Sequence, residues 1–132
     1  MDSHATDATM AARDPGRANP LTGPIRVDGA RPGDVLAVTM VDFAPSGFGW
    51  TGLIPGFGLL ADQFPEPKVH LWHYRTSRPL AFGRMAEIPL APFLGTIGTA
   101  PAAPGPHDVI PPQRVGGNMD VRDIRAGTTL YL

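Results

Sequence analysis

Glycine and proline divide this chain into short pieces. Each occupies sixteen positions among 132 residues, without a repeating period. Proline removes a backbone N–H and fixes φ, and glycine weakens the interior of helices and strands, so few elements can be long. Apolar residues nevertheless occur throughout the chain and make up 42% of it. We therefore predict a mainly β domain of sandwich, barrel or roll type, built from short strands and long Pro- and Gly-rich loops.

Several apolar runs have the length and composition of strands. We expect strands within residues 25–27, 35–43, 70–75, 79–90, 94–99 and 127–132. Residues 1–18 are small and polar and are predicted to form a flexible lead-in, so the β domain is assigned to residues 19–132. Residues 44–64 contain five glycines and almost no charge. Loops are usually polar, so this segment is expected to lie under another chain or to line a cavity.

Two segments resemble each other. VDGARPGDVLAV (27–38) and VRDIRAGTTLYL (121–132) share Val, Arg, Gly and Leu at matching positions. Either both use the same turn followed by a strand, or they arose by duplication. The final strand is expected to remain unpaired, and an exposed apolar edge favours association with a partner.

Charge and composition exclude several classes of function. The net charge is −1 and Lys68 is the only lysine, so no basic face for nucleic acid is expected. No apolar run is long enough to cross a membrane, and the first residues lack a signal-peptide pattern. Without cysteine, disulfides, thiolate metal sites and a cysteine nucleophile are excluded within this chain. We predict a cytoplasmic location.

Residues 116–120, Gly-Gly-Asn-Met-Asp, form the strongest candidate site. In an extended segment, Asn118 and Asp120 would share one face. Their oxygen atoms could bind a divalent cation, or the pair could hold a substrate amide. Gly116 and Gly117 would let backbone N–H groups approach an oxyanion. The alternative is a turn in which Asp120 caps neighbouring backbone.

Two further residues are candidates. His107 lies in the loop PGPHDVIPP, where a neutral imidazole could ligate zinc or act as a general base, or could be an ordinary surface residue. Trp50 lies in the apolar segment 44–64 and could line a small pocket or pack in a core or an interface.

Three stretches together resemble the acetamidase/formamidase family of linear amide hydrolases: residues 17–43, residues 49–64 and residues 89–132, the last containing GGNMD followed by AGTTLYL. The resemblance implies hydrolysis of formamide or acetamide to the carboxylate and ammonia, with a water activated by a divalent metal, zinc being one candidate. It implies catalytic or metal-binding roles for Asp120, Asn118 and His107. It implies substrate binding by Gly116, Gly117 and Trp50.

The resemblance covers the middle of the family and lacks both flanking segments. We therefore expect a fragment, one piece of a split protein or a truncated product, inactive by itself. The expected partners are a small amide and either further copies of the chain or a complementary chain. The alternative function is a non-catalytic β module that binds a small molecule or completes a split or oligomeric protein.

Overall fold

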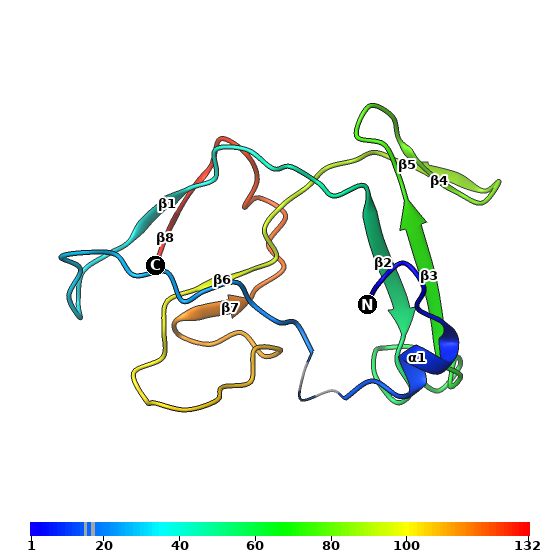
Figure 1. Cartoon of the computed structure of the whole chain (residues 1–132), viewed down its shortest axis with the longest axis horizontal. Helices are drawn as coiled ribbons and strands as arrows, with labels where there is room; N and C mark the ends of the chain where they lie inside the picture. Colours follow the sequence, from blue (N-terminus) through cyan, green and yellow to red (C-terminus); the bar gives the residue numbers. More distant parts are fainter. Residues whose placement is uncertain (15, 17) are drawn as a thin grey trace. The chain divides into compact units, whose positions relative to one another are not determined.

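The chain folds as two compact units. The computed structural model describes residues 1–14, 16 and 18–132. Unit 1 consists of Met1–Asp14 and Ala44–Ala91, and unit 2 of Pro15–Phe43 and Pro92–Leu132. Both units are mainly β, as the sequence predicts (Figure 1). The predicted division at residue 18 does not coincide with this one, because the chain passes into unit 2, returns to unit 1 at residue 44 and leaves it again after residue 91.

The described residues contain one short helix and a series of short strands. In chain order these elements are α1 (Asp7–Ala11), β1 (Ala37–Thr39), β2 (Phe48–Leu53), β3 (Lys68–His73), β4 (Leu80–Phe82), β5 (Ala86–Ile88), β6 (Thr96–Gly98), β7 (Gly116–Asn118) and β8 (Thr129–Tyr131). No helix among these residues is long and apolar enough to span a bilayer.

The strands pair as four antiparallel two-stranded sheets. The pairs are β2–β3 and β4–β5 in unit 1, and β1–β8 and β6–β7 in unit 2. Each strand therefore has one edge without a partner strand among the described residues. A two-stranded sheet is marginally stable alone, so these sheets depend on contacts made by the loops and by α1.

Most expected strands are present, with shorter bounds. The runs at 70–75, 79–90, 94–99 and 127–132 contain β3, β4 with β5, β6 and β8. The run at 35–43 forms a strand only at β1. The strand expected at 25–27 is absent, and Ile25 is 83% exposed. The first half of the apolar segment 44–64 is not a loop but strand β2.

Helix α1 lies within the predicted lead-in and is fastened to β3. The Thr6 hydroxyl accepts from Thr9 N–H (3.3 Å) and Thr9 accepts from Thr6 N–H (3.2 Å), a reciprocal cap. One Asp7 oxygen accepts from Val69 N–H (2.8 Å) and the other from Lys68 Nζ (2.9 Å). Because five residues cannot form a stable helix in isolation, these tertiary contacts account for α1. Residues 15 and 17 of the lead-in lie outside the described residues.

The buried side of α1 explains a glycine in β2. Met10 is fully buried, and a Cβ added to Gly52 would overlap the Met10 side chain. Gly52 therefore leaves the space in which Met10 packs. Arg13, just beyond α1, places its guanidinium 4.8 Å from the Trp50 ring centroid. Trp50 is thus a packing residue of unit 1 and half-buried.

Strand β8 pairs with β1, so the final strand is not unpaired as the sequence suggested. Figure 1 shows β8 (red) beside β1 (cyan), and Ala37 lies opposite Tyr131. The ladder continues to Leu132, which exchanges backbone hydrogen bonds of 2.8 and 2.9 Å with Leu36. On the outer face the hydroxyls of Thr39 and Thr129 are 2.8 Å apart.

The two similar segments adopt the same series of turns before they pair. Ala30 N–H donates to Val27 O (3.3 Å), and Ile124 N–H donates to Val121 O (3.0 Å) at the matching position. The next turn repeats as well, because Gly33 and Gly127 both have positive φ, 96° and 85°. The matching residues Ala37 and Tyr131 are also the residues that face each other. The pairing is therefore symmetric about that residue pair, as a local two-fold axis would make it.

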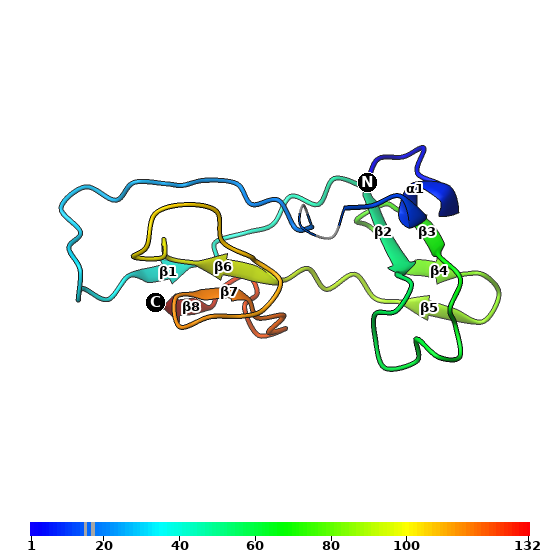
Figure 2. The ribbon, with the colours of Figure 1, turned by 90° about the horizontal axis from the view of Figure 1, so that it is seen from below.

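Strands β6 and β7 approach each other where only glycine fits. Gly116 has φ +95°, and a Cβ there would lie 2.5 Å from Ile97 O. A Cβ on Gly98, which faces Gly116 across the sheet, would lie 2.6 Å from Val115 O. Figure 2 shows the two strands side by side. Gly98 and Gly116 are thus required by the packing of this sheet, whereas a Cβ on Gly117 would make only ordinary contacts and its φ of +110° is what favours glycine.

We expect Gly116→Ala to destabilise unit 2 far more than Gly33→Ala. Gly33 has almost the same φ, 96°, but open space around it. Gly33→Ala should therefore cost only the backbone strain, about 1–2 kcal/mol, and Gly116→Ala about 2 kcal/mol more from overlap. Urea unfolding followed by circular dichroism measures both. Trp fluorescence serves as the reference, since both tryptophans, Trp50 and Trp72, lie in unit 1. Equal losses would contradict the close approach.

We expect unit 1 to lose stability in acid through Asp7. The hydrogen bond from Lys68, followed by that from Val69 N–H, lowers the pKa of the Asp7 carboxyl below its ordinary value of 3.8. The carboxylate therefore stabilises unit 1 above that value, and its contribution is lost as the pH falls through the lower pKa of the folded state. Trp fluorescence during acid titration should show that Asp7→Asn removes this dependence and Asp62→Asn does not. An unchanged acid profile in Asp7→Asn would contradict the assignment.

Candidate functional site

A small hollow in unit 2 brings together three of the predicted site residues. Its volume is about 130 Å³. It is lined by Leu21, Gly98, Thr99, Pro101, His107, Asp108, Val109, Pro111, Gln113, Val115, Gly116 and Gly117. His107, Gly116 and Gly117 therefore line the same hollow. Asn118 and Asp120 are not among the lining residues, and Trp50 belongs to unit 1.

The loop around the hollow is shaped by its own hydrogen bonds. Asp108 Oδ1 accepts from Ile110 N–H (2.9 Å), and Gln113 Nε2 donates to Asp108 O (2.9 Å). The backbones of Gln113 and Gly116 exchange two hydrogen bonds, of 2.7 and 3.0 Å. The N–H of Gly116 is one of these donors, so it is not free to hold an oxyanion as the sequence suggested. The two glycines instead provide a wall without side chains.

His107 has a defined tautomer in this loop. Its Nε2 lies 2.7 Å from Ala103 O. A carbonyl oxygen only accepts, so Nε2 carries the hydrogen and a neutral ring leaves Nδ1 with a free lone pair. The side chain is exposed at the rim of the hollow. His107 can therefore accept a proton at Nδ1 or offer that nitrogen as a ligand.

Asn118 ties three distant segments together. Its Oδ1 accepts from Asn19 Nδ2 (3.0 Å) and from Thr96 Oγ1 (2.9 Å), and its Nδ2 donates to Ile110 O (3.2 Å). Two donors saturate the amide oxygen, so this atom is not available to a cation in the structure. Asn118 holds the start of unit 2, strand β6 and the loop of the hollow in register.

Asp120 follows Asn118 in the chain and lies beside Gly95. Its φ is +53°, so the extended backbone that would have placed it on the same face as Asn118 ends before it. Its N–H and that of Met119 both donate to Gly95 O (2.9 and 3.0 Å). Asp120 is exposed, and its Oδ1 lies so close to Gly95 that a Cβ there would be 2.9 Å away. Aspartate tolerates the left-handed region better than most residues, and such strain is often found at functional sites.

No group of three His, Asp or Glu side chains forms a metal site among the described residues, 1–14, 16 and 18–132. Asn118 is committed to the hydrogen bonds described above. Metal binding by Asp120 and His107 therefore stays a prediction, without the Asn118 oxygen as a free ligand.

Sequence reasoning missed the partners of Asn118. Asn19 is 99 positions away in sequence and Thr96 is 22 positions away. The dipeptide Asn19-Pro20 is a turn signal, and Asn19 does adopt a left-handed φ of 52°. Nothing in its local sequence indicates which side chain it reaches.

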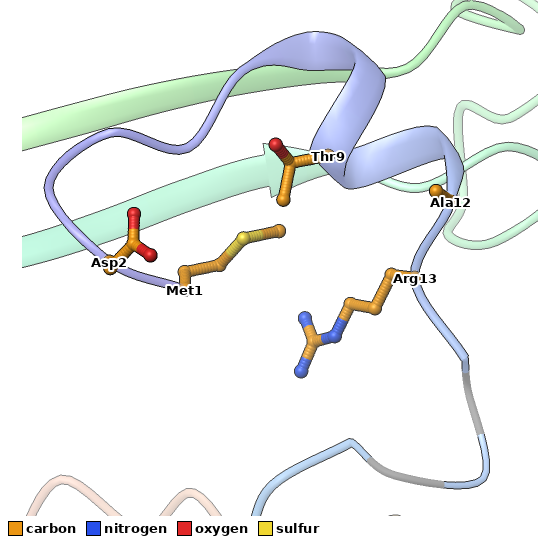
Figure 3. Close-up of a pocket in the computed structure, with 5 residues that line it drawn as sticks. All are labelled: Met1, Asp2, Thr9, Ala12 and Arg13. Carbon is orange, nitrogen blue, oxygen red and sulfur yellow. The ribbon is translucent and has the colours of Figure 1, made fainter.

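A larger hollow in unit 1 contains none of the predicted residues. It has a volume of about 580 Å³ and lies beside α1, lined by Met1, Asp2, Thr9, Ala12 and Arg13 (Figure 3). It is wide open, and Arg13 is already engaged by Trp50. The smaller hollow in unit 2 is therefore the better candidate, because its walls carry both a histidine and converging polar groups.

We expect Asn118→Ala to destabilise unit 2 by about 2 kcal/mol, because it leaves Asn19 and Thr96 without their acceptor. Asn118→Asp keeps the accepted bonds but loses the donor to Ile110 O, and should cost less. Thr96→Ser keeps the hydroxyl and is the control. Amide hydrogen exchange in β6 and β7 measures the loss. Unchanged protection in Asn118→Ala would show that the network does not stabilise the unit.

Comparison with known proteins identifies a family for this chain. The model of the Acetamidase/Formamidase family matches residues 2–107. The formamidase of Methylophilus methylotrophus is 40% identical over an alignment covering 62% of this chain and 22% of that protein. The acetamidase of Mycolicibacterium smegmatis is 33% identical, with 62% of this chain and 24% of that protein covered.

A solved structure has the same fold. The crystal structure of an acetamidase from Bacillus halodurans matches with a TM-score of 0.81 and 37% identity, over 90% of this chain and 40% of the other. The chain thus spans about a quarter of the length of the curated relatives it matches. The family match stops at residue 107, so Gly116, Asn118 and Asp120 lie beyond it. The chain belongs to the Acetamidase/Formamidase family.

Proposed function

We propose that this chain is part of a hydrolase acting on the carbon–nitrogen bond of short linear amides. The observation that carries the proposal is the hollow of about 130 Å³ in a chain of this family, with a histidine at its rim and a wall of two glycines. Relatives of this chain bear the names formamidase and acetamidase. A cytoplasmic location, which the lack of cysteine permits, is part of the same proposal.

The size of the hollow supports a very small substrate. Pockets for drug-sized ligands measure about 300–1,000 Å³, so a hollow of about 130 Å³ suits a molecule of a few heavy atoms. Formamide and acetamide are of this size. Asp108 and Gln113 supply polar groups on one side, and Leu21 and Val115 supply apolar surface for a methyl group.

His107 is the proposed proton carrier. In amide hydrolysis the oxygen of water adds to the carbonyl carbon, the carbon–nitrogen bond breaks, and the nitrogen leaves as ammonia after receiving a proton. The free Nδ1 of His107 can take the proton from the attacking water and return it to the leaving nitrogen. Its contact with Ala103 O fixes the ring orientation for that role.

Asp120 does not line the hollow, and its proposed role is to bind a cation. Its carboxylate is exposed and is held beside Gly95 by the backbone bonds of Met119 and Asp120. Asn118 then acts as a positioning residue, since its amide is engaged with Asn19, Thr96 and Ile110.

The chain is proposed to be inactive by itself. Hydrolysis of an amide needs a group that stabilises the developing oxyanion, and the N–H of Gly116 is already bonded to Gln113. His107 is exposed to water, which weakens every electrostatic interaction that it makes. The metal assistance predicted from the sequence stays a prediction, and no step is assigned to a metal here.

A second candidate function is that of an assembly module without catalysis. Each strand of the described residues has one edge without a partner strand, and many large apolar side chains are exposed. These features favour a chain that completes a larger protein, as the sequence analysis allowed.

We expect acetamide to bind the hollow weakly, with a Kd in the millimolar range, because four heavy atoms can make few contacts. In ¹H–¹⁵N NMR titrations, the amide signals of Gln113, Val115 and Gly117 should shift most. His107→Ala should weaken the response, whereas His73→Ala, which removes an exposed histidine of unit 1, should not. Shifts spread evenly over both units would contradict the proposed site.

We expect no release of ammonia from formamide or acetamide by the folded chain, with or without added Zn²⁺. The assay is run beside Asp120→Ala and His107→Ala. Zinc-dependent turnover that is lost in Asp120→Ala would contradict the proposed inactivity and would locate a working site in this chain. Turnover retained in both variants would contradict the proposed roles of these two residues.

A further inference from the structure

The turn at residues 27–30 contains the only aspartate–glycine pair of the chain, Asp28-Gly29. Ala30 N–H donates to Val27 O (3.3 Å), so Asp28 and Gly29 are the two central residues of a β-turn. No other aspartate, and neither asparagine, is followed by glycine. Because glycine has no Cβ, its nitrogen is less hindered than any other that follows an aspartate or asparagine in this chain.

The turn leaves both of these groups open. The Asp28 side chain is 92% exposed, and the Arg26 Nε that lies 3.0 Å from its Oδ1 holds it only weakly, because the pair is surrounded by water. The Gly29 N–H donates no hydrogen bond among the described residues. A Cβ built on Gly29 would meet nothing within 4 Å, so there is room for a ring beside it. Residues 20–35 are all exposed, so no neighbouring element restrains the turn.

We propose that Asp28 is a site of spontaneous isomerisation to isoaspartate in the folded chain. The Gly29 nitrogen attacks the side-chain carboxyl carbon of Asp28, and a C–N bond forms. The amide proton and the hydroxyl group of the protonated carboxyl leave as water, which gives a five-membered succinimide ring. Water then opens the ring. If the new C–N bond breaks, aspartate returns; if the bond from the nitrogen to the Asp28 backbone carbonyl carbon breaks, isoaspartate results, with no change in mass.

The matching turn of the second similar segment, residues 121–124, lacks these conditions. Arg122 stands at the position that corresponds to Asp28. The next residue, Asp123, is followed by Ile124, which is 5% exposed and whose N–H donates to Val121 O (3.0 Å). A nitrogen that is buried, hydrogen-bonded and next to a β-branched side chain is a poor nucleophile. The chain therefore contains its own control, a turn of the same form without the reactive pair.

Isomerisation should alter the first turn and spare the strand pairing. Isoaspartate carries the chain through its side-chain carbons, which lengthens the backbone between residues 28 and 29 by one atom. The hydrogen bond from Ala30 N–H to Val27 O spans this position, so we expect it to be lost. A second turn, at residues 31–34, separates the change from the ladder of β1 and β8. In ¹H–¹⁵N spectra of the aged chain, new signals are expected for the first turn and unchanged signals for the ladder.

Peptide mapping of the folded chain after several weeks at neutral pH tests the proposal. Electron-transfer fragmentation distinguishes isoaspartate from aspartate at each position. Asp28 should react at least about tenfold faster than Asp34 or Asp123, a difference of about 1.4 kcal/mol in barrier. Asp28→Glu keeps the carboxylate but would need a six-membered ring, and should form no isomer at this position. Gly29→Ala adds a methyl group in open space and should slow the reaction.

Three outcomes would overturn the proposal. Asp28 could isomerise no faster than Asp34 and Asp123, or Gly29→Ala could react as fast as the wild-type chain. The third outcome is a folded chain that reacts more than about tenfold slower at Asp28 than the chain unfolded in guanidinium chloride, which would mean that the turn protects the pair. Circular dichroism establishes that each variant is folded. The hollow takes no part in the reaction, so the result is independent of the proposed catalytic function.

Discussion

The close approach of β6 and β7 at Gly98 and Gly116 governs the geometry of unit 2. Neither residue has room for a Cβ, because a backbone carbonyl oxygen would lie 2.5–2.6 Å from it. This approach sets Asn118 opposite Thr96, so that the amide can accept from the threonine hydroxyl. Asn118 in turn holds Ile110 and thereby the loop that carries His107. Any chemistry at the hollow therefore depends on a packing constraint, and Gly116 has a structural role whether or not the hollow binds a substrate.

The sequence predicted those features that depend on local patterns. Alternating and β-branched runs indicated β3, β4, β5, β6 and β8. Strand β2 was not predicted because its glycines suggested a loop. One of these glycines, Gly52, leaves the space that the Met10 side chain occupies. Helix α1 was not predicted because it has only one buried apolar residue and lacks the apolar periodicity of an amphipathic helix. The partners of Asn118 are properties of the tertiary fold, and no local pattern encodes them.

The similarity between residues 27–38 and 121–132 is more than a repeated turn. Both segments form two successive turns with hydrogen bonds at the same positions, and their strands then pair around the matching residues Ala37 and Tyr131. Because both segments enter their strands from the same turn, corresponding residues lie on the same face of each strand. Two such faces can pair symmetrically, with the apolar side chains of Leu36, Val38, Leu130 and Leu132 half-buried on one side. Convergence and duplication both lead to this arrangement, since the physical requirement is the same.

Both the stability of this chain and its proposed chemistry would gain from the exclusion of water. Only Ala5, Met10, Met40 and Ile124 are buried apolar residues in the described part of the chain, so the units rely on capped turns, short ladders and the Asn118 network. Such polar contacts weaken when water competes for them, and so does the hydrogen bond that orients His107. Covering exposed apolar surface would strengthen the fold by excluding water. Excluding water around His107 and Asp120 is also what an amide hydrolase site requires, because charge stabilisation is strongest in a dry environment. A partner that covers the hollow and excludes water from it would therefore also favour its chemistry.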